Sequence, residues 1–122
     1  MEVISNESHY GAKVSAGVAC GPGTLMHIDS SGEAILADHS ESKWAYGIAL
    51  TSGAGTKTAQ TSQYVRLDRV ARVIVDDYVT LTTGNVVYLG EDGKYATSGT
   101  QQVGFALDTD EVYVDLDMQL GA

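Results

Sequence analysis

The stretch that decides the fold is Gly84-Asn85-Val86-Val87-Tyr88-Leu89-Gly90-Glu91-Asp92-Gly93, a short apolar run between glycines. β-Branched and aromatic residues bounded by turn residues are typical of a β-strand. Asp92-Gly93 suits a two-residue hairpin loop, because both loop positions of a type I′ turn need a positive φ. This turn would set the hairpin register and place Glu91 opposite Lys94.

The same pattern begins 61 residues earlier, at residues 23–32, where Ser31-Gly32 offers a similar turn. We interpret it as a duplicated β-unit, with related parts at approximately 17–68 and 79–118. The alternative is chance similarity among glycine-rich strands. Two such units cannot each bury a face alone, so we expect one domain, a β-sandwich or squat β-barrel. Two further pairs of segments match in the same order: 47–50 with 104–107, and 64–68 with 113–117.

The rest of the chain predicts an all-β fold as well, because short bursts of Val, Thr, Ile and Tyr recur between turn residues. The continuous apolar run Val73-Ile74-Val75 is typical of a strand buried on both faces. In 111–117 polar and apolar residues alternate, which predicts one face with Val112, Val114 and Leu116 inside. The expected strands are 10–15, 24–28, 34–36, 45–50, 63–67, 69–75, 86–89, 94–97, 102–107 and 111–117.

Composition excludes several classes of function. The chain has 122 residues, with 7 Lys and Arg against 16 Asp and Glu, a formal net charge of −9. This charge disfavours binding to nucleic acid, which requires phosphate neutralisation, and attraction to an anionic membrane surface. The single cysteine, Cys20, excludes an internal disulfide and a cysteine-built zinc site, and we expect it to be a small buried residue.

The first nine residues lie outside the repeat, and we interpret residues 1–9 as an N-terminal arm preceding a single β-domain at 10–122. The arm is polar and acidic, with Val3 and Ile4 as its apolar pair. Such an arm can add a strand to the open sheet edge of a neighbour; the alternative is a frayed terminus. Because it lacks the basic start and apolar run of a signal peptide, we expect a protein made and used without secretion.

No motif predicts a catalytic, cofactor or metal site. His9, His27 and His39 are not spaced as metal ligands, and no nucleophile elbow marks an activated serine. Asp115 and Asp117 share one strand face, where a solvent-exposed face explains them better than acid–base chemistry. We therefore expect no catalytic residue, no cofactor and no metal.

Three of the seven basic residues, Arg66, Arg69 and Arg72, lie in one short stretch of this acidic chain. Arginine pairs well with carboxylates through its planar guanidinium. Two interpretations remain open: salt bridges within the chain, or pairing between subunits at an interface formed by these arginines.

The chain also resembles a family of short tailed-bacteriophage proteins that is associated with capsid decoration. The resemblance covers roughly residues 10–118. Its carriers, in order, are Val18-Ala19-Cys20-Gly21-Pro22-Gly23-Thr24-Leu25, Gly47-Ile48-Ala49-Leu50, Val79-Thr80-Leu81-Thr82-Thr83-Gly84-Asn85-Val86-Val87-Tyr88, Gly93-Lys94 and Gly104-Phe105-Ala106-Leu107.

This resemblance implies a non-enzymatic structural protein, made in the host cytoplasm, on the outer capsid surface of the virion. Its partners would be the major capsid protein and two further copies in a homotrimer, and it would clamp the capsid lattice against packaged DNA. The arm residues Val3, Ile4, Ser5 and Asn6 would contact the capsid.

Two other classes remain as alternatives. One is a carbohydrate-binding β-module on a phage particle, with Trp44, Tyr46, Tyr10 and Tyr88 as stacking residues. The other is a small hydrolase, which the missing nucleophile pattern disfavours.

Overall fold

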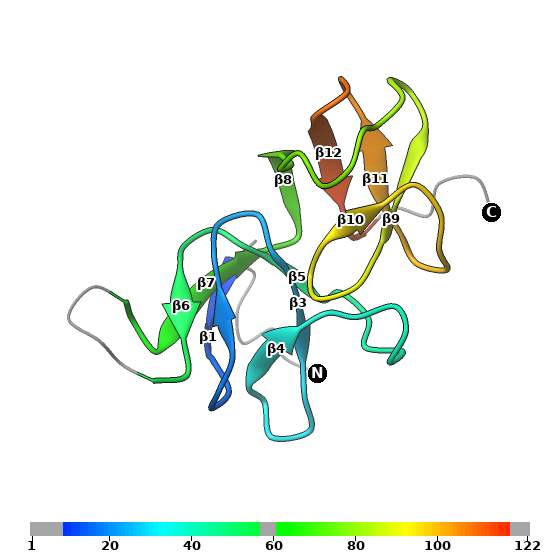
Figure 1. Cartoon of the computed structure of the whole chain (residues 1–122). Coiled ribbons are helices and arrows are strands. Elements are labelled where there is room, and N and C mark those ends of the chain that lie inside the picture. Colours follow the sequence, from blue (N-terminus) through cyan, green and yellow to red (C-terminus); the bar gives the residue numbers. More distant parts are fainter. Residues whose placement is uncertain (1–8, 57–60, 118–122) are drawn as a thin grey trace, which may run out of the picture.

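The computed structural model describes residues 9–56 and 61–117, which form one all-β domain (Figure 1). Within these ranges, no helix is present that is long and apolar enough to cross a membrane. The first large sheet contains β1 (His9–Lys13), β3 (Leu25–Ile28), β4 (Ala34–Leu36), β5 (Gly47–Ala49) and β7 (Tyr64–Asp68). The second contains β8 (Val70–Ile74), β9 (Val86–Leu89), β10 (Tyr95–Ala96), β11 (Gln102–Ala106) and β12 (Glu111–Asp115). A small third sheet pairs β2 (Ala19–Cys20) with β6 (Gly53–Ala54), two strands that the sequence did not predict.

The two large sheets have the same connectivity. Their strand orders are β1-β7-β5-β3-β4 and β8-β12-β11-β9-β10, so the first strand of each half lies at an edge beside the last. The segments 47–50 and 104–107 supply the central strands, β5 and β11. Duplication of one unit would give this arrangement. The matching strands begin at His9 and Val70, earlier than the expected repeat bounds of 17–68 and 79–118.

The two sheets differ in how far they close. In the first sheet, Val14 and Ala34 form a parallel bridge, so the β1 edge curls round to β4. The second sheet stays open between β8 and β10. The segment 22–24 of the first half lies in this opening, where the hydroxyl of Tyr95 donates to the carbonyl oxygen of Gly23 at 2.6 Å.

Two apolar cores result from this arrangement. The smaller core fills the curl of the first sheet and includes Val14, Met26 and Leu67. The larger core joins the halves, because Leu25 and Ile48 of the first sheet are buried with residues of the second. Neighbouring residues on β3, Leu25 and Met26, are both fully buried because they face different cores.

Strand β8 corrects one prediction from the sequence. Val73 and Val75 are buried, but Ile74 between them is 64% exposed, so the run is not buried on both faces. The reason is that the second sheet covers the core with one face only, and Ile74 lies on the other face. The alternation expected in β12 is confirmed, since Val112, Val114 and Leu116 are all buried.

The hairpins were predicted in part. Asp92 and Gly93 both have positive φ, as a type I′ turn requires. However, the N–H of Gly90 donates to the carbonyl oxygen of Lys94, so the strand carries an extra residue at Glu91. Lys94 therefore does not face Glu91 as an ion pair; its Nζ lies 5.2 Å from the centroid of the Tyr78 ring.

The first hairpin has a different loop. The N–H of Asp29 donates to the carbonyl oxygen of Glu33, which leaves a three-residue loop ending at Gly32, with φ of 78°. Ser31 has no positive φ, so this turn is not the close copy that the sequence predicted. The carboxylate of Asp29 holds the loop by accepting from the N–H groups of Ser31 and Glu33.

The hydrogen bond from Tyr95 of the second sheet to Gly23 of the first half makes the free energy of unfolding dependent on pH. Burial is the main cause that raises the pKa of the Tyr95 phenol well above its ordinary value near 10. The folded state therefore keeps this proton at pH values where the unfolded chain loses it. This contribution to stability is complete below pH about 10 and falls above it by up to about 1.4 kcal/mol per pH unit.

We expect Tyr95→Phe to remove the part of the decrease in the free energy of unfolding above pH about 10 that is due to Tyr95. At pH 7 the variant should be less stable by about 1 kcal/mol, because it lacks the hydrogen bond to Gly23. Urea unfolding between pH 8 and 11 measures both effects. Tyr64→Phe is the matched control, because Tyr64 is 61% exposed. An unchanged alkaline slope in Tyr95→Phe would contradict the assignment.

Candidate functional site

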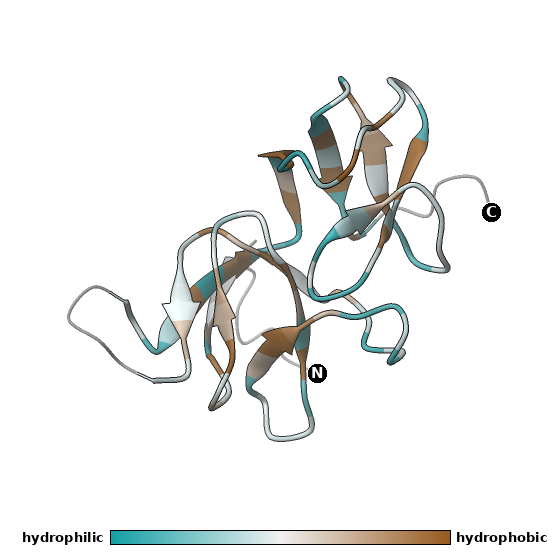
Figure 2. Ribbon diagram, viewed as in Figure 1, coloured by the Kyte–Doolittle hydropathy of each residue, from teal (hydrophilic) through white to brown (hydrophobic). Residues whose placement is uncertain are grey.

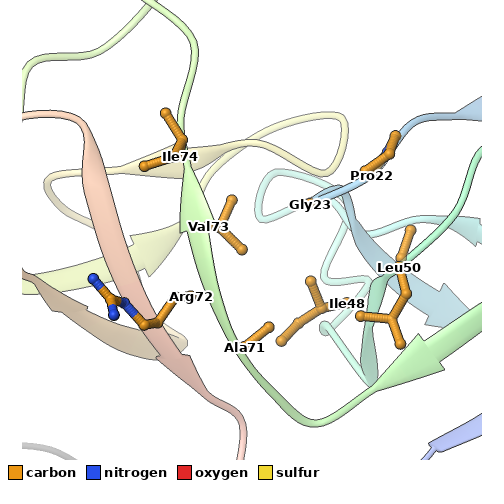
Figure 3. Close-up of a pocket in the computed structure, with 9 residues that line it drawn as sticks. Pro22, Gly23, Ile48, Leu50, Ala71, Arg72, Val73 and Ile74 are labelled. Carbon is orange, nitrogen blue, oxygen red and sulfur yellow. The ribbon is translucent and has the colours of Figure 1, made fainter.

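A cleft runs along the free edge of β8, and we call it the β8 cleft. Its first part has a volume of about 270 Å³ and lies between residues 71–74 of β8 and a wall formed by Pro22, Gly23 and residues 48–50 (Figure 3). Ala71 and Val73 point across it toward Ile48, whereas Arg72 points to the opposite side of the strand.

The second part of the β8 cleft continues along the same strand. It has a volume of about 180 Å³ and lies between residues 73–76 and a wall of residues 22–24 and 92–95. Asp76 and Asp92 bring two carboxylates to this end, and Lys94 brings one ammonium group. Among the residues that the structure describes, neither carboxylate forms an ion pair.

The backbone of β8 is polar on its open side. Val75 donates its N–H to Asp110 at 2.7 Å, and the carbonyl oxygen of Arg69 accepts from Leu116 at 2.9 Å. Antiparallel pairs alternate between bonded and non-bonded, so the odd-numbered residues of β8 turn their N–H and C=O groups toward β12. The backbone groups of Val70, Arg72 and Ile74 therefore face the open edge.

Two tyrosines stand at the acidic end of the cleft. The hydroxyl of Tyr78 accepts from the backbone N–H of Tyr95 at 3.0 Å. Burial raises the pKa of Tyr78, and the nearby charge of Asp76 raises it further. Both phenols are therefore neutral near pH 7 and act here as hydrogen-bonding groups.

The three arginines proposed for a subunit interface do not act as one cluster. Arg72 pairs with Glu111 at 2.5 Å. Arg69 joins three acceptors, namely Asp117 Oδ1 at 2.9 Å and the carbonyl oxygens of Tyr46 and Leu116. Arg66 is exposed on β7, and within the described ranges its guanidinium has no partner. Intrachain pairing thus accounts for two of the three.

We expect Arg69→Ala to lower the free energy of unfolding by about 1–2 kcal/mol, because it removes three hydrogen bonds where β7 leads into β8, the one to Leu116 being partly buried. Arg66→Ala should change it by less than about 0.5 kcal/mol. Urea unfolding at low protein concentration compares the two variants. Equal losses of free energy of unfolding in the two variants would contradict the role of Arg69 between the two sheets.

Of the four aromatic residues considered for carbohydrate stacking, the structure brings two together. Trp44 and Tyr46 are 37% and 42% exposed on one segment before β5. His27 connects them, since its ring stacks on Tyr46 at 4.9 Å and its Nδ1 lies 2.8 Å from the carbonyl oxygen of Trp44. Tyr88 is half-buried on β9 and has no ring contact with them. Tyr10 is on β1.

Other predicted features remain ordinary parts of the fold. Within residues 9–56 and 61–117, no group of three or more His, Cys, Asp or Glu could hold a metal ion. Cys20 is half-buried on β2, and burial raises the pKa of its thiol. Asp115 accepts from the N–H of Asp117 and so supports a turn. The arm residues Val3, Ile4, Ser5 and Asn6 lie outside the described residues.

Sequence reasoning missed the β8 cleft. Its signal was present as the apolar residue Ile74 in a strand that also carries Arg72, but only the sheet order shows that this strand is an edge. Comparisons of the chain with models of protein families, with curated proteins and with solved structures find no match.

Proposed function

We propose that the chain is a structural protein that binds the exterior of an icosahedral phage head as a trimer and stabilises the major capsid lattice. The supporting observation is the position of the motifs that carry the resemblance. Gly47-Ile48-Ala49-Leu50 and Gly104-Phe105-Ala106-Leu107 supply the central strands of two sheets with the same connectivity. The motifs thus lie in an all-β scaffold, which is the fold class that the resemblance implies.

Charge places a condition on this proposal. Each copy carries a formal charge of −9, so three copies repel one another unless the charges are screened or paired. The Debye length is about 8 Å at physiological salt, which screens all but close pairs. Arg66 is the predicted interface arginine whose guanidinium is left for pairing with a carboxylate of another copy, since Arg69 and Arg72 pair within the chain.

Weak contacts are sufficient for such a protein, because a trimer binds a lattice at several points at once. The arm residues 3–6 would add a further contact from each copy. The mass of the isolated chain in solution and its attachment to heads are therefore separate measurements.

Co-sedimentation with expanded, DNA-free heads, assembled from the major capsid protein of the same genome, tests the proposal. We expect the chain to pellet with the heads and to saturate at a fixed ratio to the capsid subunits. Unexpanded heads are the control for exposure of the lattice sites. A chain that stays in the supernatant at saturating concentration contradicts the proposal.

A second candidate function is a carbohydrate-binding module, which the exposed pair Trp44 and Tyr46 favours. Exposed aromatic rings can stack on sugar rings. A glycan array separates the two candidates: glycan binding that Trp44→Ala abolishes would support the module, and absence of binding would reject it.

A further inference from the structure

We infer that the free edge of β8 binds one extended segment of a partner polypeptide as an added β-strand. The inference deepens the proposed function and rests on it for the identity of the partner, because we assign the segment to the major capsid protein. The argument uses the backbone of β8, the walls of the β8 cleft and the charges at its end.

The backbone of β8 calls for a peptide rather than another ligand. Val70, Arg72 and Ile74 present N–H and C=O groups at the open edge, and in the described part of the chain none of these groups has a hydrogen-bonding partner. Alternating donors and acceptors along five residues match the edge of another strand. Such an edge spans about 17 Å at about 3.3 Å per residue.

A single segment suits this edge better than a second sheet. Pro22 and Leu50 form a wall opposite β8, across the first part of the cleft (Figure 3). One extended chain can enter between the wall and the strand. Antiparallel pairing of two full-length β8 edges, in the register centred on residue 72, would also bring Arg72 opposite its own copy, and like charges directly opposite are unfavourable.

The side chains of the cleft define the chemistry of the bound segment. Most residues that line its first part are apolar, with Ile48 and Val73 buried and Ile74 exposed, so alternate residues of the segment should be small and apolar. Figure 2 shows the ribbon of β8 in brown, the colour of hydrophobic residues, over much of its length. Asp76 and Asp92 at the other end outnumber Lys94, so a lysine or arginine of the segment should lie there.

Hydrogen exchange of the full chain, free and bound to expanded heads, tests the inference. We expect the outward amide groups within residues 70–75, those of Val70, Arg72 and Ile74, to exchange at least tenfold more slowly in the bound state. Binding with unchanged exchange at 70–75 overturns the inference and leaves the proposed function standing. Failure to bind heads overturns both. Concentration-dependent protection of 70–75 before heads are added would instead assign the edge to a second copy and overturn the inference.

Two substitutions of Ile74 distinguish the contribution of its backbone N–H to binding from that of its side chain. Ile74→Pro removes the outward N–H of β8 and no hydrogen bond to β12, as is tolerated in an edge strand. Ile74→Thr keeps the N–H and the β-branched shape. We expect at least tenfold weaker head binding for Ile74→Pro and a change below threefold for Ile74→Thr, with far-ultraviolet circular dichroism checking the fold. Equal binding by both variants would contradict strand addition.

Discussion

Replacing Gly104 by alanine is expected to lower the free energy of unfolding by about 3–5 kcal/mol, a large share of the about 5–15 kcal/mol typical of such a domain. A Cβ at this position would lie 2.0 Å from the carbonyl oxygen of Tyr113 and 3.0 Å from the Cα of Val114. Both atoms belong to the backbone of β12, which pairs with β11 at this point. The clash is relieved only by separating two central strands.

Urea unfolding of Gly104→Ala and Gly11→Ala measures this effect against a matched control. Gly11 is also a strand glycine, but a Cβ there would meet nothing within 4 Å. Gly11→Ala should therefore be neutral or stabilise by a few tenths of a kcal/mol, because alanine loses less backbone entropy on folding. A loss below about 1 kcal/mol in Gly104→Ala would contradict the close approach of β11 and β12.

Replacing Gly93 by alanine is expected to cost about 3 kcal/mol, through two separable causes. Gly93 has a φ of 74°, which costs about 1 kcal/mol for a residue with a Cβ. The Cβ would also lie 2.5 Å from Thr24 Cγ2 and 2.8 Å from the carbonyl oxygen of Leu25. These atoms belong to the first half of the chain, so the loss of stability from this contact measures how closely the two halves pack.

Gly84→Ala isolates the first cause. Gly84 has a φ of 87°, but a Cβ there would meet nothing within 4 Å. We expect Gly84→Ala to cost about 1 kcal/mol and Gly93→Ala about 2 kcal/mol more, measured by urea unfolding under identical conditions. If both variants lost the same amount, the hairpin at Gly93 would not pack on residues 24 and 25.

Local chemistry made much of the fold predictable from the sequence. Short runs of β-branched residues between turn residues gave strands within a few residues of their bounds, and Asp92-Gly93 gave a turn with two positive φ angles. Each of these features depends on residues close together in the chain. Alternation worked in β12 for the same reason, since Val112 and Val114 face one core.

Features that depend on distant residues could not be predicted in this way. The exposure of Ile74 depends on which face of the second sheet covers the core, and the register of β8 on β12, about 40 residues later, places Ile74 on the other face. The role of Arg69 depends on acceptors in Tyr46 and Leu116, which only the folded chain brings together. The β8 cleft depends on the sheet order and on the segment 22–24 of the first half, so Ile74 and Arg72 were not sufficient to predict it.

Cryo-electron microscopy of expanded heads incubated with an excess of the chain tests the central claim most directly. The account predicts additional density on the outer surface at threefold and quasi-threefold positions, three copies at each, with a capsid segment beside β8. A map of bare heads, reconstructed from a mixture in which the chain is folded and in excess, would contradict it.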